Sequence, residues 1–232
     1  MRGTAAMTDR ASNGVDSAGT ADQRRAQMLH AALEVISERG YADTRIADVA
    51  ERAGVSPALV IYYFKTKDQL LTEAIRYYED HWYAAGQRRM AEMTSAAAQL
   101  EEYVAMNCLT EHDPEPAGSG SLWLDFWSQA VRNPEVASVR QKSDERWRAV
   151  IAALVVAGQE AGEFRQVDPD NFAVCMSTLL DGMTIQIALN DPVVDGVRGF
   201  ELSMQFAADQ LGFSWTAGRG RQTAEQQVRP EG

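Results

Sequence analysis

The sequence predicts an all-α protein that carries a helix-turn-helix near its N-terminus. None of its 232 residues lies in a segment that alternates apolar and polar side chains, as a half-buried strand does. Apolar residues recur instead at spacings of three and four, which places them on one face of a helix. Residues 44–71 hold two short patterns of this kind, joined by the turn Ala53-Gly54-Val55. A short helix, a glycine turn and a second short helix form the helix-turn-helix motif.

The two ends of the chain are expected to be disordered. Residues 1–21 are rich in Ala, Ser, Thr, Gly and Asp without helical periodicity, and residues 213–232 are dominated by Gly, Gln and Arg. The first helix is expected to start at about Asp22 and to end at Gly40. Its core-facing side chains recur at helical spacing, and they are Met28, Leu29, Ala32, Leu33 and Ile36.

The caps and the periodicity predict the two helices of the motif. Gly54 ends the first helix, because glycine takes a positive φ at no steric cost. Ser56 caps the second helix and Pro57 is its first residue. Val60 and Phe64 lie four residues apart and share the buried face, so the other side chains of this helix point outward.

The outward face of the second helix favours DNA binding. In a helix-turn-helix the second helix enters the major groove, and the alternative is an ordinary helical hairpin. The helix is too short to pack well alone, and it exposes Tyr62 and Tyr63 beside Lys65 and Lys67, as a phosphate-facing end would.

The rest of the chain is predicted to form further helices. A long helix starts at about Lys67 and runs toward Met93. Residues 112–121, with two prolines, two glycines and two serines, are expected to form a loop. The other helices are expected within residues 96–110, 122–134, 134–158, 171–189 (with Asp168 as a possible cap) and 197–211.

Residues 40–71, GYADTRIADVAERAGVSPALVIYYFKTKDQLL, resemble the N-terminal domain of TetR-family transcriptional regulators. The resemblance covers residues 24–76 and is strongest to choline-responsive BetI-type members, which also carry an apolar residue where Leu59 stands. Ala47 and Ile61 depart from the arginine and tyrosine that many members have, so the operator of a relative does not transfer.

The resemblance implies a function and a division of the chain. It implies a ligand-responsive, homodimeric transcriptional regulator of about nine helices, which we interpret as a repressor that a small molecule releases from a palindromic operator. The DNA-binding domain would span residues 22–68, and the ligand-binding and dimerisation domain would span residues 69–212. A rival interpretation is a helical ligand-binding or scaffold protein without DNA binding, in which the apolar patch from Pro57 to Leu59 contacts another protein.

The net charge of −11 is unevenly distributed. Residues 22–67 carry +1 and residues 1–21 are neutral, so the remainder carries −12. Attraction to DNA depends on the local field rather than on the total charge. An acidic body is therefore compatible with a DNA-binding head.

The sequence contains no pattern that predicts catalysis. It has no HExxH, no GxSxG, no phosphate-loop glycines and no clustered His and Cys, so we predict no enzyme, no metal and no cofactor. No apolar run approaches the about 20 residues of a membrane span, and no signal peptide is expected. Cys108 and Cys175 are expected to be free thiols in a cytoplasmic protein.

Nine residues are the candidate DNA contacts. Arg45 is the one long donor that would read a guanine, or it would pair with Asp43 or Asp48. The apolar residues of the second helix suit thymine methyl groups, whereas the tyrosines and Lys67 would anchor the DNA backbone. The set is Thr44, Arg45, Ser56, Pro57, Ala58, Leu59, Tyr62, Tyr63 and Lys67.

Seven residues are the candidate effector contacts. The resemblance places the aromatic ones on helices that wall the ligand cavity, and aromatic faces attract cations. Asp125 and Asp181 would add a counter-charge, so a cationic effector is expected. A flat apolar effector is an alternative, and so is a plain tryptophan core without a ligand. The set is Tyr103, Met106, Trp123, Phe126, Trp127, Trp147 and Asp181.

The last two helices are the candidate dimer interface. They carry more apolar side chains than one chain covers, so we expect a four-helix bundle with the partner that buries on the order of 2,000 Å² or more. The candidate interface residues are Phe172, Cys175, Leu179, Met183, Phe200 and Met204.

Overall fold

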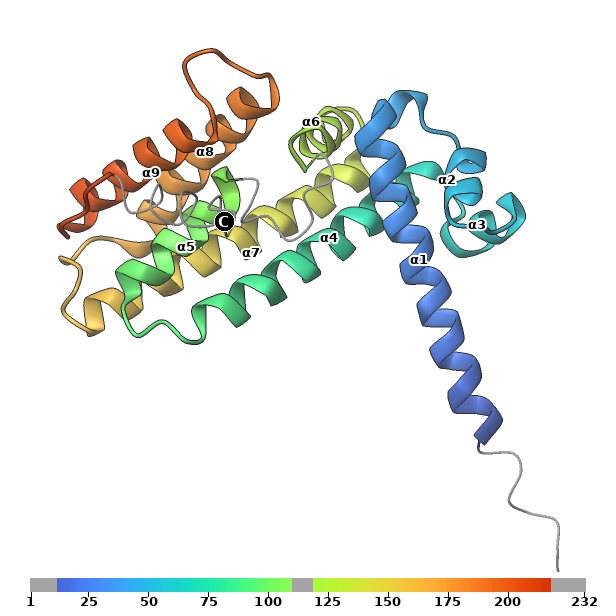
Figure 1. Cartoon of the computed structure of the whole chain (residues 1–232), viewed down its shortest axis with the longest axis horizontal. Helices are drawn as coiled ribbons and strands as arrows, with labels where there is room; N and C mark the ends of the chain where they lie inside the picture. Colours follow the sequence, from blue (N-terminus) through green and yellow to red (C-terminus); the bar gives the residue numbers. More distant parts are fainter. Residues whose placement is uncertain (1–11, 110–118, 218–232) are drawn as a thin grey trace, which may run out of the picture. The chain divides into compact units, whose positions relative to one another are not determined.

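The computed structural model describes residues 12–109 and 119–217, and these residues form nine helices and no strand (Figure 1). The all-α prediction is confirmed. No helix in these two ranges is long and apolar enough to cross a membrane. The helices are α1 (Ser12–Asp43), α2 (Ile46–Arg52), α3 (Pro57–Phe64), α4 (Lys67–Met90), α5 (Ala96–Cys108), α6 (Ser119–Ala130), α7 (Pro134–Glu160), α8 (Pro169–Ala188) and α9 (Gly196–Leu211).

Three segments differ from the sequence-based expectation. α1 begins at Ser12, so helix continues into residues that were expected to be disordered. α6 begins at Ser119, inside the predicted loop of residues 112–121. After α9, Phe213 packs against Phe164 and Trp215 packs against Phe200, because apolar rings in a polar tail are buried where the body offers a surface. Residues 1–11, 110–118 and 218–232 of these predicted segments lie outside the described residues.

Contacts divide the chain into two compact units. Among the described residues, the first unit comprises 12–80 and 119–129, and the second comprises 81–109 and 130–217. Helix α6 therefore belongs with the helix-turn-helix, although it follows α5 in the sequence. Helix α4 begins in the first unit and ends in the second. The domain boundary expected between residues 68 and 69 stays a prediction.

The first unit is built on the side chains that the periodicity assigned to its core. Met28 of α1, Val49 of α2, Phe64 of α3 and Ile75 of α4 are all completely buried. At 25 cal/mol per Å², burying each such side chain stabilises the fold by about 1.5–3 kcal/mol. This shared core fixes α2 and α3 against α1 and α4.

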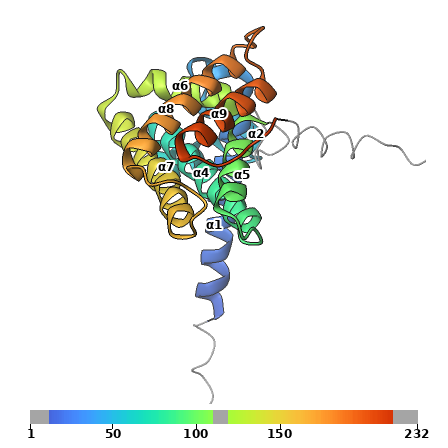
Figure 2. The same cartoon turned by 90° about the vertical axis from the view of Figure 1, so that its left-hand side faces the viewer.

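The second unit is a bundle in which α7 packs on α8, α8 packs on α9, and α5 contacts all three (Figure 2). Carboxylates cap helix N-termini in this unit, at Asp168, Glu163 and Asp195. Asp168 accepts hydrogen bonds from the first turn of α8, as the sequence predicts. Glu163 reaches from the turn after α7 to α5, where it accepts N–H bonds of Ala96 and Ala97 at 3.1 Å and the Ser95 hydroxyl at 2.7 Å.

Gly158 of α7 tests the packing of this bundle. A Cβ at Gly158 would lie 2.0 Å from the buried ring of Phe164, so Gly158→Ala is expected to destabilise the protein by roughly 2 kcal/mol or more. Gly182 of α8 is the matched control, because a Cβ there meets nothing within 4 Å. Gly182→Ala is expected to be neutral or to stabilise by up to about 1 kcal/mol. Urea unfolding measures both, and equal effects would contradict the packing.

Candidate functional site

The turn of the helix-turn-helix has the geometry that its residues predict. Gly54 adopts a φ of 64°, which a side chain would strain. The Ser56 hydroxyl accepts the Leu59 N–H at 3.2 Å, and Pro57 follows the cap. Val60 and Phe64 are completely buried. These contacts fix the rotation of α3 about its own axis.

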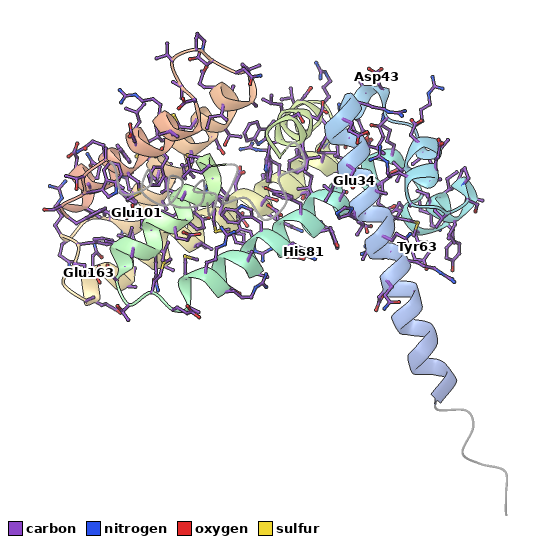
Figure 3. The ribbon with its side chains drawn as sticks, in the orientation of Figure 1. Glu34, Asp43, Tyr63, His81, Glu101 and Glu163 are labelled. Carbon is purple, nitrogen blue, oxygen red and sulfur yellow. The ribbon has the colours of Figure 1, made fainter. Side chains whose placement is uncertain are left out.

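The opposite face of α3 is open to solvent. Pro57 and Ala58 are exposed, Leu59 is half-buried, and Tyr62 has 69% of its surface exposed. Tyr63 lies on the same helix (Figure 3). Its ring stands edge-on to Tyr62 at 5.5 Å between ring centroids. The side chains predicted to face a groove therefore share one surface, which offers apolar groups toward its N-terminal end and phenol rings toward its C-terminal end.

Three arginines of the first unit are held by carboxylates. Arg52 bonds Glu34 and Glu38 of α1, and its guanidinium lowers the pKa of Glu38. Arg25 bonds Glu73, and Arg39 bonds Asp48 at 3.0 Å. These pairs tie α1 to α2 and to α4.

Arg45 differs from these arginines. The Asp48 carboxylate accepts its backbone N–H at 2.8 Å and also pairs with Arg39. Within the described part of the chain no ion pair of the Arg45 guanidinium is found, and the residue is exposed at the start of α2. Neither Asp43 nor Asp48 pairs with this guanidinium among the described residues, and the contact of Arg45 with DNA stays a prediction.

Two predicted DNA contacts have other roles in this structure. Thr44 is buried, and its hydroxyl donates to the Gly40 carbonyl at 2.8 Å rather than facing solvent. The Lys67 ammonium donates to the Ala42 carbonyl at 3.1 Å and lies 4.2 Å over the Tyr41 ring, and burial lowers its pKa. Both residues hold the junction between α1 and α2, which the spacing of the sequence did not reveal.

The predicted effector residues fall into two separate groups. Trp123, Phe126 and Trp127 of α6 contact one another and Tyr78 in the first unit. Tyr103 and Trp147 belong to the second unit, as does Met106, which is buried and faces α4 at Gly86. The prediction that all of them line one cavity stays a prediction.

Two aromatic residues of α4, Trp82 and Tyr83, pack with Tyr103 and Trp147 of the second group. We call these four residues the aromatic cluster: Trp82, Tyr83, Tyr103 and Trp147. The Trp82 ring centroid lies 5.2 Å from Tyr83, 5.3 Å from Tyr103 and 5.4 Å from Trp147, onto which it stacks. Trp82 was not among the effector contacts that the sequence predicted. The crowding of four aromatic residues within residues 77–83 was the available signal.

Charged groups lie on the helices around the aromatic cluster. The Arg146 guanidinium sits 3.9 Å over the Tyr83 ring. Burial and, to a lesser degree, the Asp144 carboxylate raise the pKa of Asp181 to about 6, while Arg140 and Arg148 act in the opposite direction. The Trp147 Nε1–H is buried and has no hydrogen-bond partner among the described residues. The cluster thus combines aromatic faces with a buried N–H donor, and the half-buried Asp181 lies on α8 of the same unit.

Asp125 does not act as the expected counter-charge in this structure. Its carboxylate lies in the first unit, where it accepts the Tyr41 N–H at 2.6 Å. Asp181 alone of the two predicted acids belongs to the unit that holds the aromatic cluster. In the residues that the structure describes, no three His, Cys, Asp or Glu side chains gather as a metal site requires.

The candidate dimer-interface residues fall into a buried set and a set that is at least partly exposed. Phe172, Phe200 and Met204 are buried within their own chain, so the structure does not support them as contacts to a partner. The helical pattern of the sequence cannot separate packing between α8 and α9 from packing across a dimer. Cys175 is exposed, and Leu179 and Met183 are half-buried, so these three stay candidates.

Comparison with known proteins identifies relatives of both parts of the chain. Residues 28–74 match the family model described as "Bacterial regulatory proteins, tetR family", and residues 96–212 match "BetI-type transcriptional repressor, C-terminal". The HTH-type transcriptional regulator BetI of Burkholderia mallei is 30% identical over 83% of this chain and 95% of its own length. BetI of Paraburkholderia xenovorans is 30% identical over 76% of this chain and 88% of its own length.

Solved structures of transcriptional regulators also resemble this chain. A transcriptional regulator from Saccharomonospora viridis, solved in complex with choline, has a TM-score of 0.72 and 26% identity, covering 82% of this chain and 98% of that one. A TetR-family regulator from Rhodococcus sp. has the same TM-score and identity, over 82% of this chain and 99% of that one.

Arg45 tests the DNA-binding surface. Arg45→Ala is expected to weaken binding to a DNA fragment selected by the wild-type protein by about tenfold or more, and to reduce the salt slope by about 1. Arg52→Ala is the control, because Glu34 and Glu38 already hold that guanidinium. Fluorescence anisotropy over a series of salt concentrations measures both slopes. An unchanged slope in Arg45→Ala would remove this residue from the interface.

Asp181 tests the electrostatics of the second unit. The native pKa of about 6 lies above the ordinary 3.8, so between these values the native state binds more protons than the unfolded state. Stability from this group is therefore lost as pH rises through that window. Asp181→Asn is expected to stabilise the protein above pH 6, by at most roughly 3 kcal/mol, and to have little effect near pH 4. Thermal unfolding at both pH values, with the exposed Asp209→Asn as control, would show a gain confined to the higher pH.

Proposed function

The chain belongs to the TetR family of bacterial regulatory proteins and carries a BetI-type C-terminal domain, and we propose its function from this family membership. It is a transcriptional regulator. We infer that it acts as a homodimeric repressor, and that a small quaternary ammonium compound with the chemistry of choline releases it from its operator.

The aromatic cluster is the observation that carries this proposal. A cation is attracted to an aromatic face within about 6 Å of the ring centroid, and tryptophan attracts it most strongly. Trp82 and Trp147 are in mutual contact with Tyr103, so their faces can converge on one ammonium group. The regulator from Saccharomonospora viridis, which resembles this chain in sequence and fold, was solved in complex with choline.

The remaining groups of the cluster suit the rest of such a ligand. The buried Trp147 Nε1–H would donate to the hydroxyl of choline, which relieves a buried donor that lacks a partner among the described residues. Arg146 already covers the Tyr83 ring, so the ammonium group is assigned to the Trp82, Tyr103 and Trp147 side. Asp181 would supply negative charge from α8 once it is ionised.

Binding requires the cluster to open. Trp82 and Trp147 stack at 5.4 Å between centroids, and two rings that both contact one ammonium group lie farther apart than this. The effector therefore separates α4 from α7 at Trp82. Because α4 starts at Lys67 and Asp68, which hold the α1–α2 junction, displacement of this helix would disturb the DNA-binding helices.

The dimer supplies the geometry for the operator. A two-fold dimer would place two copies of α3 in successive major grooves of a palindrome, roughly 34–36 Å apart or somewhat more. Val174 and Cys175 of α8 and Val197 of α9 are exposed in the single chain and would be covered by the partner. The rival interpretation, a helical protein without DNA binding, predicts that the purified chain selects no DNA.

A titration with choline tests the effector. Choline is expected to quench the tryptophan fluorescence of the wild type and to release it from DNA that it selected. Trp147→Phe is expected to weaken choline binding about tenfold, because phenylalanine attracts cations less strongly and has no N–H. Isothermal titration calorimetry measures the affinity.

Two controls separate the alternatives. Trp127→Phe changes the aromatic group of the first unit and is expected to leave choline affinity unchanged. 3,3-Dimethylbutanol has the shape of choline without its charge. If this neutral compound binds as tightly as choline, the effector is apolar and the cation proposal fails, whereas loss of binding in Trp127→Phe alone would move the site to α6.

A further inference from the structure

Helix α1 is interrupted at Gly40, and the interruption separates the Tyr41 N–H from the Ser37 carbonyl. Gly40 adopts a φ of 80° and a ψ of 157°, a conformation that only glycine takes readily. In a continuous helix the Tyr41 N–H would donate to the Ser37 carbonyl. The turned peptide directs the Tyr41 N–H away, and one further turn follows, closed by the Thr44 N–H on the Gly40 carbonyl at 3.2 Å.

Helix α6 supplies partners to both separated groups. The Asp125 carboxylate accepts the Tyr41 N–H at 2.6 Å, and the Ser121 hydroxyl, one turn earlier on α6, lies 3.5 Å from the Ser37 carbonyl. Asp125 therefore caps the turn of residues 41–44 as an N-cap residue would, although it is 84 residues away in the sequence. A carboxylate at this position is also favoured by the helix dipole.

The capped turn leads directly into the helix-turn-helix. Only Thr44 and Arg45 separate the end of α1 from the start of α2. Arg45 is the N-cap residue of α2, and its backbone N–H donates to the Asp48 carboxylate. Its side chain is exposed. A rotation of the turn would therefore change the direction of α2 and the position of the Arg45 side chain.

We propose that Asp125, assisted by Ser121, is a positioning residue for operator binding: it holds the turn of residues 41–44 in the orientation that presents α2 and Arg45 to DNA. Asp68 and Lys67 of α4 also hold this turn, through the Tyr41 hydroxyl and the Ala42 carbonyl. Asp125 accepts the Tyr41 N–H, directly after Gly40. Removal of the Asp125 carboxylate would therefore free the Gly40–Tyr41 peptide, on which the orientation of α2 depends. This inference rests on the DNA-binding function and does not depend on the effector.

The chain contains a matched control for the capping chemistry. Glu163 caps α5 from a distant segment with the same chemistry, a carboxylate on backbone N–H groups, but lies in the second unit (Figure 3). Removing either carboxylate removes a helix cap, and the loss of a cap destabilises a protein by about 1 kcal/mol. Only removal of Asp125 is expected to change the DNA affinity of the folded protein.

Asp125→Ala, Asp125→Asn and Glu163→Ala would be compared with wild type. Affinity for DNA selected by the wild type is measured at a temperature where circular dichroism shows every variant folded. Asp125→Ala is expected to lose tenfold or more in affinity, and Asp125→Asn, whose amide oxygen still accepts the bond, to retain affinity within about threefold. Glu163→Ala is expected to bind as the wild type. Wild-type affinity in Asp125→Ala, or an equal loss in Glu163→Ala, overturns the proposal.

Hydrogen exchange of the Tyr41 amide, measured without DNA, gives an independent readout. Exchange is expected to accelerate about tenfold or more in Asp125→Ala and to remain slow in Asp125→Asn. A protected Tyr41 amide in Asp125→Ala overturns the cap. If no DNA is selected by the wild type, the regulator function fails, while this exchange experiment still decides whether Asp125 holds the turn.

Discussion

The conformation of Gly40 is the constraint on which the placement of the DNA-binding helices depends. A positive φ at this position interrupts α1 and starts a separate turn, which leaves backbone groups that other elements must satisfy. Asp125 of α6 and the start of α4 provide those partners. The helix-turn-helix is therefore oriented by two helices that lie outside the motif, as well as by its own core at Val60 and Phe64.

Helix α4 links this junction to the aromatic cluster. Lys67 and Asp68 in its first turn contact residues 41 and 42, and Trp82 and Tyr83 later in the same helix belong to the cluster. In the proposed mechanism, a ligand that separates Trp82 from Trp147 would act directly on α4. Any change that reached the junction would be limited by the difference in the ligand's affinity for the open and closed clusters.

The sequence predicted the features that depend on local backbone preference. Gly54, Ser56 and Pro57 each have the predicted role, because caps and positive φ are properties of single residues. It did not reveal contacts that depend on distant partners. Thr44 and Lys67 bind carbonyl groups of the α1–α2 junction, and Trp127 lies in a different unit from Trp147. Helical periodicity gives the face of a residue but not the helix against which that face packs.

The same limit explains why the tryptophans had two competing interpretations, a core and a cation cage. In the closed cluster Trp82, Tyr103 and Trp147 satisfy the description of a core, since they pack against one another at 5.3–5.4 Å. Separating one aromatic pair costs about 0.5–1.5 kcal/mol beyond the surface it exposes. Each desolvated cation–π contact contributes about 2 kcal/mol. A quaternary ammonium group that contacts two or three of these rings would offset the cost of opening, whereas an uncharged compound of the same shape would have only dispersion and apolar burial to do so.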